Sequence, residues 1–165
     1  MIGNVYRLAL GADTVLPGNH SNIYPCQRIG SCEMPPKQLT GDQAAAFAIT
    51  ELNAMVYWIN LESGELLRCP SVGGCPNTAI LANATALGGK ALQPLIDGGR
   101  AVLATDAGKL VACDTDKCST TVRTLSPAPH VIASLRHDAT SIYRVEADRA
   151  PDMNPLSYRV MRLAN

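Results

Sequence analysis

The sequence has no surplus of charge of either sign. Its 165 residues include 14 Lys and Arg and 14 Asp and Glu, so the formal net charge is zero. Proteins that bind nucleic acids need a surplus of basic side chains to contact the phosphates. The sequence also has no apolar run of about 18 residues, the length that a membrane-spanning helix requires. It therefore predicts neither a nucleic-acid partner nor a membrane span.

Aromatic residues make up only 4% of the chain, whereas Gly and Pro are abundant, with 13 and 11 residues. Frequent Gly and Pro predict many turns and few long helices. Residues 41–55 (GDQAAAFAITELNAM) are the best helical candidate by propensity. The repeat described below requires a strand there, and we expect tertiary context to override local propensity.

Six cysteines form three close pairs at a nearly constant interval. The pairs are Cys26/Cys32, Cys69/Cys75 and Cys113/Cys118. The first members of successive pairs are 43 and then 44 residues apart. A period of about 40–45 residues is typical of a repeat architecture in which each repeat is one supersecondary unit.

The short spacing within each pair favours structural disulfides. Two pairs have five intervening residues and one has four, so the two Cβ atoms of a pair can meet across a short hairpin loop. A zinc site is disfavoured because it needs four ligands brought together, and reduced thiols are the other alternative. Disulfides predict an oxidising compartment, extracellular or periplasmic.

Residues 1–18 (MIGNVYRLALGADTVLPG) lack the features of a signal peptide. They contain one Arg and a short apolar stretch interrupted by Gly and Asp, with no small-residue cleavage site. This absence conflicts with an oxidising compartment. We therefore expect the export signal to lie outside this chain, in preference to reduced cysteines.

Short apolar segments recur in the same order around each cysteine pair. A Gly residue precedes the segment that ends at the first cysteine in the second and third repeats. We expect strands at residues 4–9, 21–26 and 36–40, at 45–52, 55–60, 64–69 and 77–82, at 91–99, 101–105, 108–113 and 120–125, and at 131–139, 141–146 and 158–163. Four short antiparallel strands per period are typical of a β-propeller blade.

The predicted fold class is therefore all-β, a propeller of about four blades or partial blades. We expect one domain, residues 1–165, with blades at about 4–42, 43–86, 87–129 and 130–165. The first and last repeats have only three strands, which leaves three alternatives open. In the first, the chain is a segment of a larger secreted propeller. In the second, it closes a ring with a second copy or another subunit. In the third, it closes alone with four blades. We favour the first two.

Two repeats carry extra residues between their second and third predicted strands. These insertions span about 11–21 in the first repeat and 147–157 in the fourth. Insertions that fall on one face of a repeat protein often form its binding face. We expect these two loops to form the contact surface.

Residues 53–70 (NAMVYWINLESGELLRCP) resemble the blade repeat of YWTD-type β-propellers, with Tyr57 and Trp58 at the Tyr-Trp position. With the cysteine pair that follows, they are also similar to cysteine-containing secreted propeller-repeat proteins of myxobacteria and related bacteria. The first and fourth repeats depart from the pattern, because Arg7 and Arg144 stand where Trp is expected. The resemblance implies a fold and a binding or scaffold role more firmly than an activity.

Two polar groups invite a functional interpretation. Asp114 and Asp116 lie in the segment CDTDKC, where calcium would need six to eight oxygen ligands, so we favour a solvated turn. His137 and Asp138 are adjacent, and neighbours in a strand point to opposite faces. We therefore expect them to serve a turn and not to share a site.

The predicted function is binding by a secreted or periplasmic scaffold whose partner is a protein or a carbohydrate. We assign no catalytic, cofactor-binding or metal-binding residue. The alternative is a propeller hydrolase, lactonase-like or glycan-active, with a metal such as calcium at the central channel. That alternative is disfavoured because no acidic residue or His recurs at matching positions in the four repeats.

Overall fold

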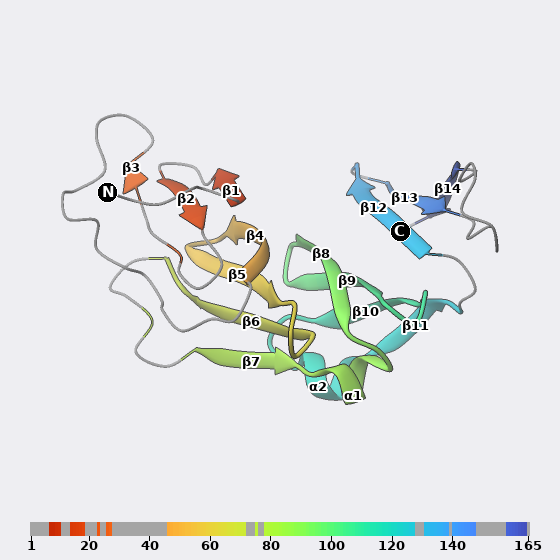
Figure 1. Cartoon of the computed structure of the whole chain (residues 1–165), viewed down its shortest axis with the longest axis horizontal. Coiled ribbons are helices and arrows are strands. Elements are labelled where there is room, and N and C mark those ends of the chain that lie inside the picture. Colours follow the sequence, from red (N-terminus) through yellow and green to blue (C-terminus); the bar gives the residue numbers. More distant parts are fainter. Residues whose placement is uncertain are drawn as a thin grey trace. The chain divides into compact units, whose positions relative to one another are not determined.

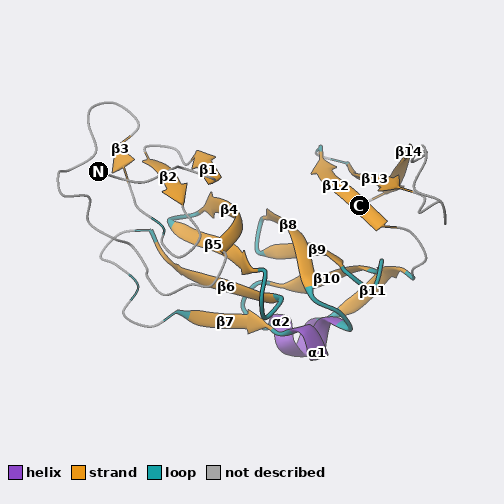
Figure 2. Ribbon diagram, viewed as in Figure 1, coloured by secondary structure: helices purple, strands orange, loops and turns teal. Residues whose placement is uncertain are grey.

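The computed structural model describes residues 7–10, 14–18, 23, 26–27, 46–71, 75, 78–127, 131–138, 140–147 and 158–164. Within these residues the chain forms fourteen strands in four antiparallel sheets of three, four, four and three strands (Figures 1 and 2). Two single-turn helices, α1 (Ala84–Leu87) and α2 (Cys118–Thr121), were not expected from the sequence. The all-β class agrees with the prediction, and so does the strand count of the last three repeats.

The strands of the first sheet lie at other positions than those predicted for the first repeat. Its strands are β1 (Arg7–Leu10), β2 (Thr14–Gly18) and β3 (Cys26–Gln27), in that order. The third strand was expected at residues 21–26, and residues 11–21 were expected to be an inserted loop. Instead, β2 runs through that segment and pairs with β1.

Composition explains this error. The segment contains Pro17 and Gly18, which usually indicate a loop, but the pairing of β2 with β1 overrides composition. Cys26 belongs to β3 and pairs with Val15 of β2. Like Cys69 and Cys113, it lies in the third strand of its sheet. Cys32 and the strand expected at 36–40 lie outside the described residues.

The second sheet has the strands predicted for it: β4 (Ala46–Leu52), β5 (Met55–Asn60), β6 (Glu65–Pro70) and β7 (Ala79–Ala82), in sequence order. The segment with high helix propensity forms β4, so pairing with β5 outweighs propensity. Trp58 is fully buried and Tyr57 is 5% exposed. Trp58 packs in a cluster with Ile23, Val56 and Leu67.

The third and fourth sheets also follow the prediction. The third contains β8 (Ala91–Asp97), β9 (Arg100–Thr105), β10 (Leu110–Asp114) and β11 (Arg123–Ser126). The fourth contains β12 (Val131–His137), β13 (Ser141–Ala147) and β14 (Tyr158–Ala164). Strands adjacent in sequence are adjacent in each sheet, the up-and-down order of a propeller blade. Ten residues separate β13 from β14, where the second insertion was predicted; residues 148–157 lie outside the described residues.

A shared core joins the third and fourth sheets. The third sheet contributes Val102, Ala104, Leu110 and Ala112, and the fourth contributes Ile132, Leu135 and Ile142. The backbone N–H of Leu135 also donates to the side-chain oxygen of Gln93 at 3.2 Å. The two sheets therefore pack face to face within one compact unit, residues 84–165, while residues 1–83 form another unit.

Candidate functional site

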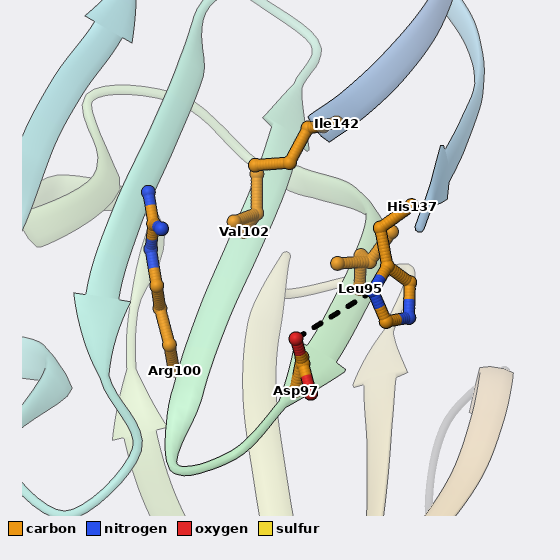
Figure 3. Close-up of a pocket in the computed structure, with 6 residues that line it drawn as sticks. All are labelled: Leu95, Asp97, Arg100, Val102, His137 and Ile142. Carbon is orange, nitrogen blue, oxygen red and sulfur yellow. Dashed lines mark ion pairs between the residues drawn. The ribbon is translucent and has the colours of Figure 1, made fainter. Parts of the chain in front are cut away.

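A surface cleft lies where the third and fourth sheets meet. It is small and partly open to solvent. It is lined by Leu95, Asp97, Arg100, Val102, His137 and Ile142 (Figure 3). These residues belong to β8 and β9 of the third sheet and to β12 and β13 of the fourth. Ionisable and apolar side chains thus share one small site.

A two-residue turn places Asp97 and Arg100 at the cleft. They face each other as the last register pair of β8 and β9, and Gly98 and Gly99 connect them with φ values of +52° and +91°. Positive φ at both central residues gives the turn a twist that matches the flanking strands, and glycine adopts this conformation without a Cβ penalty. The Asp-Gly-Gly sequence therefore fixes where β8 ends.

His137 reaches across from the fourth sheet to Asp97. Its Nδ1 lies 3.5 Å from Asp97 Oδ2, and the side chains are 38% and 57% exposed (Figure 3). Solvent screens an ion pair this exposed, so its contribution to stability is at most about 1 kcal/mol when the imidazole is protonated. The main effect of the pair is to hold a carboxylate and an imidazole together at the rim of the cleft.

The floor of the cleft is apolar. Val102 and Ile142 are buried and belong to the core shared by the two sheets, and Leu95 packs against that core. An apolar floor beneath a few polar groups is the usual composition of a binding pocket. The lining therefore places the exposed polar groups Asp97 and His137 above a well-packed apolar base.

Asp138 does not share this site with His137, as predicted. Its Oδ1 accepts hydrogen bonds from the backbone N–H groups of Thr140 and Ser141, both at 2.8 Å, and its Oδ2 accepts one from the Tyr143 hydroxyl at 2.8 Å. These bonds, the one from the Thr140 N–H above all, lower the pKa of Asp138 from 3.8 to about 2. Asp138 therefore holds the turn between β12 and β13.

Sequence reasoning missed the pairing of His137 with Asp97, which are 40 residues apart. A signal for it was nevertheless present. Both residues stand at the end of the first strand of successive repeats. Because successive sheets pack against each other, equivalent strand ends come close together in space.

The cysteines of the second and third repeats lie at disulfide distance. The Cα atoms of Cys69 and Cys75 are 5.6 Å apart, and those of Cys113 and Cys118 are 4.8 Å apart. In both pairs the first cysteine belongs to the third strand and the second follows it before the fourth strand. Each pair therefore lies at the corner where the sequence placed it. For the first pair, Cys32 lies outside the described residues.

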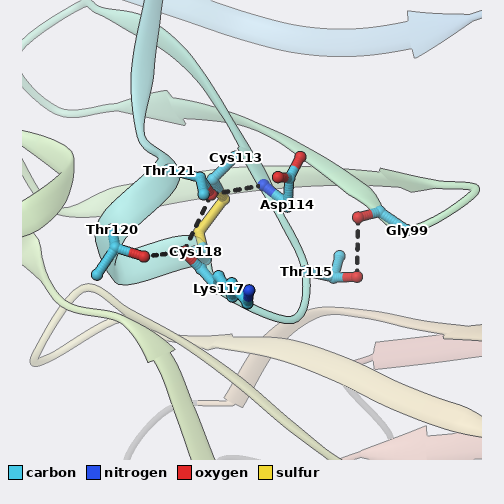
Figure 4. The surroundings of a disulfide bond; sticks show 8 residues. All are labelled: Gly99, Cys113, Asp114, Thr115, Lys117, Cys118, Thr120 and Thr121. Carbon is cyan, nitrogen blue, oxygen red and sulfur yellow. Dashed lines mark hydrogen bonds between the residues drawn. A yellow bond between two sulfur atoms is a disulfide. The ribbon is translucent and has the colours of Figure 1, made fainter.

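Hydrogen bonds stiffen the corner around Cys113 and Cys118 (Figure 4). The Thr121 hydroxyl accepts from the backbone N–H of Asp114 and donates to the carbonyl of Lys117, both at 3.0 Å. The Thr115 hydroxyl donates to the carbonyl of Gly99 at 2.9 Å. The Asp114 and Asp116 residues are exposed, and the described part of the chain has no group of three or more His, Cys, Asp or Glu that could hold a metal ion.

A buried ion pair lies on β13. Arg144 Nη2 is 2.6 Å from Glu146 Oε1, and these side chains are 10% and 7% exposed. Arg144 occupies the position of Trp58 in the second repeat, as the sequence alignment of the repeats indicated. The Nε of Arg144 has no hydrogen-bond partner. A charged pair thus replaces a large apolar side chain in the fourth sheet.

No family profile and no curated protein sequence matches the chain, but solved structures do. The N-terminal domain of Nup159 matches with a TM-score of 0.67 at 10% identity, over 98% of this chain and 45% of that chain. The computationally designed Ika4 protein matches with a TM-score of 0.66 at 13% identity, over 98% and 92%. A chain of a nidogen/laminin complex matches with a TM-score of 0.65 at 12% identity, over 92% and 61%.

These matches show the fold of the chain. It is all-β and of the propeller type, with sheets that correspond to blades or partial blades. The chain spans less than half of the Nup159 domain and less than two thirds of the nidogen/laminin chain. No helix among the described residues is long and apolar enough to cross a membrane.

Proposed function

We propose that the chain is a propeller-type scaffold that binds a protein partner, and that the cleft between the third and fourth sheets is its contact site. The cleft carries the proposal, because it combines an apolar floor with the Asp97 carboxylate and the His137 imidazole at an exposed rim. Such pockets accept the anchor side chain of a partner. The contacts around that side chain contribute little to the binding free energy. The match to a chain of a nidogen/laminin complex supports a protein partner.

The cysteines support an extracellular or periplasmic location for this scaffold. Two pairs at disulfide distance suit an oxidising compartment. The same proposal includes the YWTD-like repeat and the similarity to secreted bacterial propeller proteins. The burial of Tyr57 and Trp58 in the second sheet supports that assignment.

Selection of peptides from a random display library tests the proposal. We expect the oxidised wild-type chain to enrich a peptide motif, and Asp97→Ala to weaken binding of the selected peptides at least tenfold. Asp97 lies at a turn and is half exposed, so the variant should fold like the wild type. Glu62→Ala is the matched control, because Glu62 is an exposed carboxylate in the turn after β5.

We expect the selected peptides to bind Glu62→Ala as tightly as the wild type, whereas their binding to Asp97→Ala is weakened. No enriched motif, or equal binding to wild type and Asp97→Ala, would overturn the assignment of the cleft. A parallel glycan array separates the two partner classes. Glycan binding that depends on Asp97, in the absence of peptide binding, would replace the protein partner by a carbohydrate.

A further inference from the structure

The Asp97 carboxylate keeps most of its hydrogen-bonding capacity for an external donor. The only ion pair among the residues that line the cleft joins it to His137 (Figure 3). The distance of 3.5 Å between His137 Nδ1 and Asp97 Oδ2 is long for a hydrogen bond. An ionised carboxylate only accepts hydrogen bonds and has room for about four. A polar group that binds Asp97 must therefore be a donor.

The permanent cation of the cleft does not occupy Asp97. Arg100 is the register partner of Asp97 in β8 and β9, but its guanidinium lies away from the Asp97 carboxylate (Figure 3). The rest of the lining beside His137 is apolar. The exposed acceptor at the rim is complemented by the head group of a Lys or Arg side chain, which donates hydrogen bonds and carries a positive charge.

His137 sets the charge of this part of the rim. Histidine is the side chain that ordinarily changes its charge between pH 5 and pH 8. With a neutral imidazole the pair of Asp97 and His137 carries one negative charge, and with a protonated imidazole it carries none. Protonation opposes a basic ligand in two ways, because the imidazolium attracts the carboxylate and repels a second cation.

The charged groups on the neighbouring strands form a background that protonation of His137 does not alter. Arg100 on β9 remains charged, because a guanidinium does not lose its proton in proteins. On β13, the register partner of His137 is the apolar Ile142. Arg144 and Glu146 follow on the same face of β13 and are paired with each other. The charge of this buried pair is therefore balanced within β13.

The charged neighbours of His137 on β12 point to the other face of the sheet. Arg136 Nη1 donates to the carbonyl of Leu135 at 2.6 Å. Asp138 accepts the hydrogen bonds of the turn, the one from the Thr140 N–H above all, which lower its pKa to about 2, so it stays ionised above pH 5. Among the described residues that line the cleft or flank it on β12 and β13, His137 is thus the group whose charge changes in mild acid.

We propose that the cleft binds a Lys or Arg side chain of the protein partner through Asp97, and that protonation of His137 releases it. The inference rests on the proposed function, because it assigns the chemistry of the partner's side chain and the pH dependence of that same site. The scaffold then holds its partner at neutral pH and releases it in a mildly acidic medium.

Peptides selected on the wild type at pH 7.5 test the inference. The library contains no His, and the synthetic peptides are blocked at both ends, so their own charge is constant between pH 7.5 and pH 5.5. We expect the enriched motif to contain Lys or Arg. Replacement of that residue by Met in the peptide should weaken binding at least tenfold, because Met keeps the apolar stem and removes the charge.

The pH dependence is measured with one such peptide on the wild type and on His137→Gln, whose side chain does not titrate. We expect the Kd to rise about fivefold from pH 7.5 to pH 5.5 for the wild type and less than twofold for the variant. The ratio of the two Kd values is the readout, whatever the affinity of the variant at pH 7.5. His137 is 38% exposed, and circular dichroism at both pH values confirms that the variant is folded.

Three outcomes would overturn the inference and leave the proposed function standing. They are peptides that need Asp97 but carry no basic residue, a Kd that is the same at both pH values, and an equal rise of the Kd in the wild type and His137→Gln. The absence of any enriched peptide overturns the proposed function, and this inference with it. The two failures are therefore distinguishable.

Discussion

At the scale of single residues, the fourth repeat differs most from the others in its charged groups. Asp138 fastens the turn between β12 and β13 with its carboxylate, and Arg144 and Glu146 carry opposite charges into a buried position. The first group is exposed and acts through hydrogen bonds to backbone donors. The second is desolvated, so each charge depends on the other. The two arrangements respond differently to pH and to substitution.

The depressed pKa of Asp138 predicts a pH dependence of stability. A carboxyl group whose pKa is lower in the folded chain stabilises the fold above its unfolded pKa, near 3.8, and that stabilisation is lost as the pH falls through about 2. We expect Asp138→Asn to lower the melting temperature at neutral pH, and the difference from wild type to shrink between pH 4 and pH 2. A pH-independent difference would show that the charge is not responsible. Asp114→Asn, at the exposed end of β10, serves as the control.

The buried pair predicts strong non-additivity. Glu146→Leu leaves the Arg144 charge buried without compensation and should lower the free energy of unfolding by about 3–5 kcal/mol. The double variant Arg144→Met/Glu146→Leu removes both charges at similar volume and should recover most of that loss. Urea denaturation of the wild type, both single variants and the double variant measures the coupling. Additive effects of the two substitutions would contradict a buried pair.

At the scale of elements, the hairpin corner after each third strand is the most distinctive unit. In the third sheet it combines the pair Cys113 and Cys118, the single turn α2 and the hydroxyl bonds of Thr115 and Thr121. The cysteines are both buried there. The corner therefore connects β10 to β11 with little freedom, although β11 itself is short and largely exposed at its start.

Removing the third-repeat disulfide should cost about 2 kcal/mol, the value that loop-closure entropy gives for so short a loop. We expect the variant Cys113→Ala/Cys118→Ala to lose this amount in chemical denaturation without reductant. The same variant should lose less than the wild type when reductant is added, because the wild type has one more disulfide to lose. Identical stability of variant and wild type under oxidising conditions would mean that the two thiols are not bonded.

At the scale of the whole molecule, the chain divides into two compact units, residues 1–83 and 84–165. Each has its own cluster of buried side chains, around Trp58 in the first and around Leu110 in the second. The cluster of the second unit crosses between two sheets. A blade in this protein is therefore not an independent unit, because it shares its core with a neighbouring blade.

The division into two units predicts which residues are destabilised by a substitution in one core. Ile142→Ala should destabilise the second unit by about 2–5 kcal/mol, the usual cost of truncating a buried Ile. We expect hydrogen exchange measured by mass spectrometry to accelerate across residues 84–147 much more than across 46–71. Equal acceleration in both ranges would show that the chain unfolds as one cooperative domain, as the sequence had suggested.

Local sequence patterns were sufficient to place the strands wherever the apolar segments, the turn residues and the repeat period indicated the same positions. The Gly residues before the cysteine strands, the Asp-Gly-Gly turn and the apolar segments around Tyr57 place the strands of the last three sheets within a few residues. The first repeat failed because its second strand, β2, contains Pro17 and Gly18 and looks like a loop.

The sequence by itself determined the all-β class, the order of the strands and the corners at which the second and third cysteine pairs lie, because each depends on turns and on apolar alternation within a few residues. Only the tertiary structure decided that His137 meets Asp97, that Arg144 is buried and that Val160 is exposed. Those properties depend on which sheet covers which face. Equivalent residues in successive repeats have the same local pattern but different neighbours, so their burial and their partners are set by packing between sheets.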